Sequence, residues 1–262
     1  YKSTDITVQN FIKVLTGLYP GVGTNRTLQS TSNDRVFLYF ADHGTCGGLY
    51  FPDKSYIAYN ELQKTLTTMY DLKMYGKLVF LVEACSAGSM FFFWELPPNM
   101  YVQTASPVFA VSFAWNYDAS LGVYLSNVFT QTIWNLTESA GPKGLVFQDT
   151  YEFLLTHNDN GSQICQYGDL NIAHELNLND FFGTKQQRSA SSSEKSSLNH
   201  VGDRKQVQSV GANEARYEMA KLRVQHDPTA SNIAALKYEE RVRQRVDNAL
   251  HNILHSAGLN NG

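Results

Sequence analysis

The chain has 262 residues, of which 43% are hydrophobic and 13% aromatic, and its formal charge at pH 7 is −3. These values are typical of a globular protein with one main domain, and they exclude the basic surface on which nucleic-acid binding depends. No apolar run approaches the roughly 20 residues that cross a bilayer, so we expect no membrane partner for this chain. Because the chain begins at Tyr1 without an initiator Met, we expect further sequence, with a signal peptide, upstream.

The first part of the chain predicts a helix followed by a βαβ unit. Apolar residues recur at helical spacing over 8–15, directly after Thr7 as a cap. Continuous apolar runs at 35–41 and 77–83 predict strands that are buried on both faces, and a helix that Asn60 can cap separates them. Such a unit forms a parallel sheet whose ligands collect at the carboxyl ends of the strands.

The middle of the chain predicts four further elements. They are a strand at 100–105, a long amphipathic helix near 121–138, a short helix near 147–157 and a last strand at 162–167.

The last part of the chain changes composition twice. Residues 184–212 are rich in Ser, Lys, Gln and Asn, which predicts a flexible linker or processing region. Residues 213–262 predict an amphipathic helical segment with a basic face that carries Arg241, Arg243 and Arg245. A helix of this kind needs a partner surface.

The cysteines and the glycosylation sequons bear on compartment and cofactors. Cys46, Cys85 and Cys165 form no C-x-x-C pair, which argues against a zinc site and a dense disulfide framework, so we expect neither metal nor cofactor. Three N-glycosylation sequons, at Asn25, Asn135 and Asn160, favour a location in the lumen of the secretory pathway.

Two reactive side chains follow the two strands of the βαβ unit. His43 comes just after the first strand and Cys85 just after the second, so both are expected at one edge of the sheet. A lone His or Cys at a strand end is usually structural, but the pair favours nucleophilic catalysis by a thiol with a histidine base. Backbone N–H groups of Gly44 and Cys85 could then form an oxyanion hole.

The surroundings of this pair resemble a known family. Asp42-His43-Gly44 and Glu83-Ala84-Cys85-Ser86-Ala87-Gly88-Ser89 are similar to the histidine and cysteine motifs of the legumain family of caspase-like cysteine peptidases. The segments 5–17 and 162–168 also resemble the family, and the resemblance covers residues 1 to about 183. The catalytic subunit of the glycosylphosphatidylinositol transamidase is a relative, but it typically has Asp-Thr where this chain has Glu83-Ala84.

The resemblance implies a fold and a set of site residues. The fold is a caspase-like α/β/α sandwich with a mostly parallel sheet, formed by a catalytic domain over 1–183 whose first strand lies upstream of Tyr1. That strand would carry the Asn that orients the histidine and a pocket Arg. Glu83 and Ser112 correspond to pocket residues for an asparagine side chain, whereas Asn127 stands where the family has an acid, which weakens the case for strict asparagine preference.

The resemblance also implies an activity and its control. We expect a lysosomal or vacuolar endopeptidase that cleaves peptide and protein substrates after Asn, with Asp as a second residue to be considered, and that is made as a zymogen. Its own C-terminal segment, 213–262, would cover the Cys85 edge as a prodomain, with arginines attracted to acids near Glu83 and released on acidification. A transpeptidase or transamidase-like relative and a noncatalytic peptide-binding relative remain alternatives.

Two departures from the family pattern stay open at this point. Cys46 replaces a small residue or proline and is either a bystander or a redox-active thiol. The aromatic run from Phe91 to Trp94 either packs in the core or forms a wall of the substrate groove.

Overall fold

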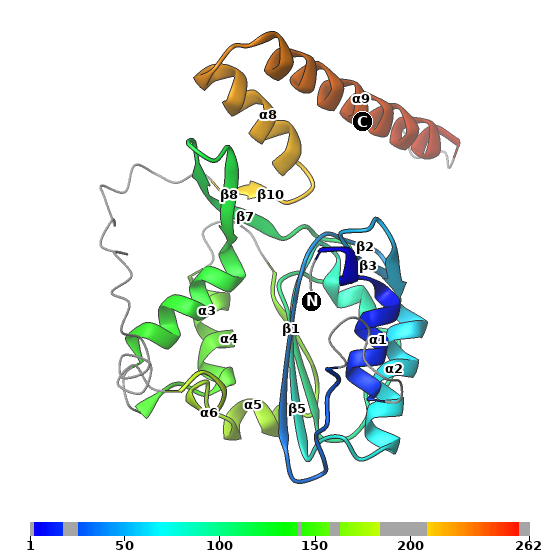
Figure 1. Cartoon of the computed structure of the whole chain (residues 1–262), viewed down its shortest axis with the longest axis vertical. Coiled ribbons are helices and arrows are strands. Elements are labelled where there is room, and N and C mark those ends of the chain that lie inside the picture. Colours follow the sequence, from blue (N-terminus) through cyan, green and yellow to red (C-terminus); the bar gives the residue numbers. More distant parts are fainter. Residues whose placement is uncertain (1–2, 18–25, 141–142, 158–162, 184–208, 257–262) are drawn as a thin grey trace.

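The structure is a computed structural model that describes residues 3–17, 26–140, 143–157, 163–183 and 209–256. After a short 3₁₀ turn, η1 (Ser3–Asp5), the chain builds one central sheet with helices on both faces (Figure 1).

The central sheet has four strands in the order β1-β5-β6-β9. Its members are β1 (Arg35–Ala41), β5 (Lys77–Glu83), β6 (Met100–Thr104) and β9 (Cys165–Gly168). The first three are parallel and β9 runs antiparallel to β6. The predicted α/β architecture with a mostly parallel sheet is therefore confirmed.

Alternate side chains of β5 enter two separate cores. Phe80 and Val82 belong to one cluster, and Val79 and Leu81 belong to the other, as the twofold period of a strand requires. The first cluster is closed by α1 (Val8–Thr16) and α2 (Tyr59–Asp71). The second is closed by α3 (Val128–Ser139), α4 (Phe147–Thr156), α5 (Leu170–Glu175) and α6 (Asn179–Phe182). Figure 1 shows the two groups on opposite sides of β1 and β5.

The first two helices begin close to where the sequence predicts. Thr7 caps α1, because its side chain accepts a hydrogen bond from Asn10 N at 3.2 Å. The start of α2 lies two residues earlier than expected, because Ala58 and not Asn60 is its cap. Asn60 is inside the first turn, where its side-chain oxygen accepts from Glu61 N.

The first strand is less buried than its apolar sequence predicts. In β1 only Val36 and Phe40 are buried, and Tyr39 is 45% exposed. The reason is position, because β1 is the edge of the described sheet, whereas β5 lies between two neighbours and is buried from Leu78 to Glu83.

The predicted helix near 121–138 is wrong in its first third. Residues 123–127 form the strand β8 (Val123–Asn127), which pairs antiparallel with β7 (Phe113–Asp118), and α3 starts only at Val128. Apolar residues at 121, 125, 128 and 129 mimic a helical period, but pairing with β7 overrides it. Gly122, at φ +66, turns the chain into β8.

A second small sheet occupies the segment that the sequence shows only as a glycine-rich turn. Its antiparallel strands are β2 (Gly44–Thr45), β3 (Gly48–Tyr50) and β4 (Tyr56–Ala58). It lies between β1 and α2 in the chain and carries the residues that follow His43.

The C-terminal segment differs from the single helix that the sequence predicts. It forms α8 (Ala215–His226) and α9 (Ala230–Ser256), which are separated at Pro228, where a proline cannot continue the preceding helix. The predicted linker lies mostly outside the described residues, at 184–208, and its end forms β10 (Val210–Gly211), the third strand of the β10-β7-β8 sheet. Among the described helices, none is both long and apolar enough to cross a membrane.

Candidate active site

The structure places His43 and Cys85 at matching positions beyond two neighbouring strands. Ala41 pairs with Glu83 at the ends of β1 and β5, so each candidate residue follows its strand by the same two positions. The ladder extends one step further, because Asp42 N donates to Glu83 O at 3.2 Å. The predicted convergence of the thiol and the imidazole at one sheet edge therefore holds at the level of the backbone.

The sulfur of Cys85 lies in a polar niche that is nearly closed. The residue is only 7% exposed, and its Sγ accepts a hydrogen bond from Ser112 N at 3.4 Å. The Ser112 hydroxyl lies 3.9 Å from the same sulfur. Ser112 is thus brought to the thiol as well as to Glu83, and its N–H points where the negative charge of a thiolate would develop.

Gly44 lies directly against Cys85, the candidate nucleophile. A Cβ at position 44 would overlap the carbonyl oxygen of Cys85, so only glycine fits there. The peptide groups that were expected to form an oxyanion hole are therefore neighbours in space. A separate hydrogen bond, from Tyr50 N to His43 O at 2.9 Å, fixes the start of the β2–β3 hairpin beside the site.

Three serines hold the loop after Cys85, and the sequence did not identify their roles. Ser86 adopts a left-handed backbone, at φ 53, and its N–H donates to Ala110 O at 2.7 Å. Buried Ser106 donates to Ala84 O and accepts from Ala87 N. Ser89 donates to Ser86 O and accepts from Gly47 N, which ties the 3₁₀ turn η2 (Ala87–Met90) to the hairpin. The run of small residues after Cys85 was the available signal.

Glu83 is a buried carboxyl beside the thiol. It is 2% exposed, and within the described residues neither of its oxygens has a hydrogen-bond partner. Burial raises its pKa to about 8, although the Ser112 hydroxyl and the Thr130 N–H, which approach it without hydrogen-bond geometry, lower the pKa in part. A buried carboxyl in this environment is held mainly in its neutral form at neutral pH.

The comparison with protein families identifies the chain. Residues 1–184 match the model of the peptidase C13 family. The chain belongs to the peptidase C13 family. This is a family of cysteine peptidases, and the caspase-like fold class expected from the sequence is confirmed together with the resemblance to legumains.

Curated members of the family give the measure of this relationship. Legumain of Bos taurus is 35% identical over 198 residues, which cover 72% of this chain and 44% of that protein. The vacuolar-processing enzyme delta-isozyme of Arabidopsis thaliana is 34% identical over 126 residues, with 47% and 26% covered. The putative GPI-anchor transamidase of Drosophila melanogaster is 31% identical over 143 residues, with 54% and 40% covered. The chain thus spans less than half the length of the legumain that it matches.

Asn127 lies at a junction that can present its side chain to the site. It ends β8 and precedes the first turn of α3, and its side chain makes no capping bond to that turn. Its partner in β7 is Ala114, two residues after Ser112. The position where the family has an acid is therefore filled by a partly buried amide whose polar atoms are not used to cap the helix.

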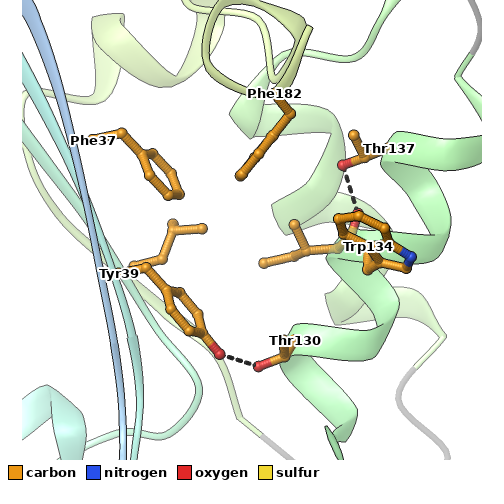
Figure 2. A pocket seen from close by; sticks show the side chains of 8 residues that line it. Phe37, Tyr39, Thr130, Trp134, Thr137 and Phe182 are labelled. Carbon is orange, nitrogen blue, oxygen red and sulfur yellow. Dashed lines mark hydrogen bonds between the residues drawn. The ribbon is translucent and has the colours of Figure 1, made fainter. Parts of the chain in front are cut away.

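An apolar hollow of about 230 Å³ lies between the sheet and α3, and it includes neither Cys85 nor His43. Figure 2 shows Phe37, Tyr39 and Phe182 facing Trp134 across it, with the Tyr39 hydroxyl 2.6 Å from the Thr130 hydroxyl. Its lining holds aromatic rings, aliphatic groups and hydroxyls, which suits it to packing and gives it no part in acid–base chemistry.

Proposed function

We propose that the full-length protein that contains this chain is a cysteine endopeptidase that cleaves peptide bonds after asparagine. The observation that carries the proposal is the surroundings of Cys85: its sulfur accepts a hydrogen bond from the Ser112 N–H, and the backbone of Gly44 lies against its carbonyl group. Buried Glu83 stands two residues before it. Membership of the peptidase C13 family and the legumain relatives support it.

In this proposal His43 takes the thiol proton as the Cys85 sulfur attacks the carbonyl carbon of the scissile bond. The carbonyl π electrons move to oxygen, and the N–H groups of Gly44 and Cys85 bind the resulting oxyanion. When the carbon–nitrogen bond breaks, His43 gives its proton to the leaving amine and a thioester remains. A water molecule, deprotonated by His43, then releases the acid and restores the thiol.

The proposed role of Glu83 is to recognise the asparagine side chain. Below pH about 8 its carboxyl is mostly protonated, so it offers one O–H donor and one carbonyl acceptor to an amide that has both complements. The two oxygens without partners would then be satisfied by the substrate. Ser112, directly before β7, and Asn127, the last residue of β8, complete the proposed pocket.

The thiol assignment can be tested with a covalent trap. An asparagine-containing peptide with a chloromethyl ketone should alkylate Cys85, and mass spectrometry should find the adduct there. Cys85→Ala should lower turnover by several orders of magnitude. Cys46→Ala is the matched control, because Cys46 is an exposed free thiol in the β2–β3 turn. Labelling of Cys46 with loss of activity in its variant would overturn the assignment.

We also propose that residues 209–256 belong to a segment that restrains the zymogen. Val210 and Gly211 pair with Ala114 and Phe113 at the edge of β7, and Ala212 N donates to Ser112 O at 2.8 Å. A substrate peptide that reaches Cys85 can add to the same edge by β-strand pairing. Occupation of this edge by β10 is therefore a physical reason for low activity before processing.

The electrostatic part of the original expectation needs correction. Arg243 forms an ion pair with Glu214 at 3.3 Å and lies over the ring of Tyr217, so its partners belong to its own segment. Glu83 has a pKa of about 8 and is already mostly neutral at pH 7. Acidification therefore cannot release the segment by protonating Glu83, and release by cleavage of the linker is the remaining proposal.

Transpeptidation stays as a second candidate because transamidases are among the relatives. An amine can resolve the thioester in place of water. We favour hydrolysis because the legumain alignment covers 72% of the chain and the transamidase alignments 54%. Addition of glycyl peptides at millimolar concentration tests this, since a ligated product in excess over the acid would establish the second candidate.

For location we propose the lumen of a lysosome or vacuole, because one relative is a vacuolar-processing enzyme and the chain has three sequons. Asn135 lies exposed on α3, while Asn25 and Asn160 are outside the described residues.

A further inference from the structure

The aromatic run after the nucleophile divides between core and surface. Phe91 is fully buried and packs edge-to-face on Phe80, with ring centroids 5.8 Å apart. Phe92 and Phe93 are each 63% exposed, and Phe109, on the loop after β6, is 84% exposed. Core packing therefore explains Phe91, and it leaves the exposed rings unexplained. Large apolar groups gathered on a surface mark a binding site more often than isolated ones do.

Phe92 and Phe109 are walls of one open hollow of about 550 Å³. Pro107, Tyr151, Cys165 and Tyr167 line it as well. Phe93, although its exposure equals that of Phe92, does not line it. The hollow thus has the size and the mainly apolar surface that suit a large side chain.

The hollow is continuous with the loop that carries the candidate nucleophile. Ala110, another lining residue, accepts through its carbonyl from Ser86 N at 2.7 Å, one residue after Cys85. On the opposite side, a Cβ at Gly88 would overlap Pro107 and the Tyr167 hydroxyl, so the loop packs tightly on the hollow. The segment from Pro107 to Ser112 therefore lines the hollow at one end and donates to the Cys85 sulfur at the other.

We propose that this hollow is a subsite for an aromatic or other large apolar side chain of a polypeptide substrate. The proposal rests on the proposed peptidase function, and it adds a second specificity element a few residues from the asparagine. A polypeptide held at Cys85 must pass close to the 107–112 segment, and an aromatic side chain on it can be buried between Phe92 and Phe109. Rings in edge-to-face or offset contact add to the area that such burial removes from water.

The test is a phenylalanine scan of peptide substrates with the activated full-length protein. One series places a single Phe at each of the four positions before and after a fixed Asn, with Ser elsewhere. We expect one position at which Phe raises kcat/KM at least about tenfold. Phe109→Ser and Phe92→Ser should remove this gain while leaving the all-Ser peptide unaffected. Phe93→Ser is the matched control and should keep the gain.

A flat scan overturns the proposal, and so does equal loss in Phe93→Ser. Unchanged peptide kinetics with an altered oligomeric state in Phe109→Ser would overturn it in favour of a contact between copies of the chain. The same peptides are also titrated against Cys85→Ala, with binding followed by fluorescence anisotropy. Binding that depends on Phe109 without any turnover by the active form would refute the peptidase function and leave the subsite standing.

Discussion

Glu83 combines a central place in the site with an environment that disfavours its charge. Its folded pKa of about 8 lies above the ordinary value of 4.5, because burial penalises the ionised form. Between these two values the unfolded chain has lost the proton that the folded chain still holds. The free energy of unfolding therefore falls as pH rises through this window, by roughly 1.4 kcal/mol for each pH unit.

Glu83→Gln should flatten this dependence, because an amide does not titrate. The proteins carry Cys85→Ala, which prevents self-cleavage, and their free energies of unfolding are measured in urea at pH 5 and pH 8. From pH 5 to pH 8 the protein with Glu83 should lose roughly a few kcal/mol more of this free energy than the protein with Glu83→Gln. Glu95→Gln, which changes an exposed carboxylate, is the control and should behave like the parent. Equal slopes for all three proteins would contradict the buried, protonated carboxyl.

Asn127 governs how the proposed pocket treats aspartate. An amide at this position is neutral at every pH, whereas an acid repels an ionised aspartate and accepts it only after protonation. We expect the parent to cleave after Asn with weak pH dependence in its acceptance of Asp. Asn127→Asp should make the ratio of kcat/KM for Asp and Asn peptides rise several-fold more steeply between pH 7 and pH 5. An unchanged ratio would place position 127 outside the pocket.

For individual residues, the sequence identified the candidate catalytic side chains but not the contacts that support them. The pair His43 and Cys85 was visible because each follows an apolar strand. The supporting hydroxyl of Ser106 was not, because it reaches Ala84 across 22 positions and follows no local pattern. The high pKa of Glu83 depends on its burial in the folded chain, which a strand pattern alone does not show.

The β7–β8 hairpin is the element on which the proposed restraint would act. Arg223 of α8 donates from Nε and Nη2 to Gly122 O, at 3.1 and 2.7 Å, and so fastens the helix beside β10. Such a charge-assisted contact at a partly exposed place contributes about 1 kcal/mol. Loss of the contact shifts the balance between docked and free segment by roughly fivefold.

Arg223→Ala should therefore raise the activity of the uncleaved protein at neutral pH by up to about fivefold. The proteolytically processed protein should be unaffected, because the restraint is absent there. Arg216→Ala removes an exposed arginine of the same helix and is the matched control. Equal neutral-pH activity of the parent and Arg223→Ala, measured with one fluorogenic asparagine peptide, would contradict the proposed restraint.

Elements were predictable where local pattern and tertiary environment agree. α1 has a cap, an apolar face and a glycine stop, and it appears as expected. β8 has an equally clear helical period, but its residues pair with β7, so the pattern misled. Pro228 carried a clear signal that divides the C-terminal segment, but residues 213–262 were expected to form one helical segment.

For the whole molecule, the parallel strands explain why chemistry collects at one edge. β1 and β5 end side by side at Ala41 and Glu83, so His43 and Cys85 follow at matching positions of the same sheet edge. This arrangement was predictable because a βαβ unit has few topologies. The β10-β7-β8 sheet was not predictable, because it joins segments separated by about eighty residues across a stretch of low apolar content.

Cleavage-site profiling of the activated full-length protein with an unbiased peptide library tests the central claim most directly. The account predicts cuts predominantly after Asn at acidic pH, all of which disappear in Cys85→Ala and persist in Cys46→Ala. A preference for basic or bulky apolar residues at the scissile bond, or cuts that survive in Cys85→Ala, would contradict it.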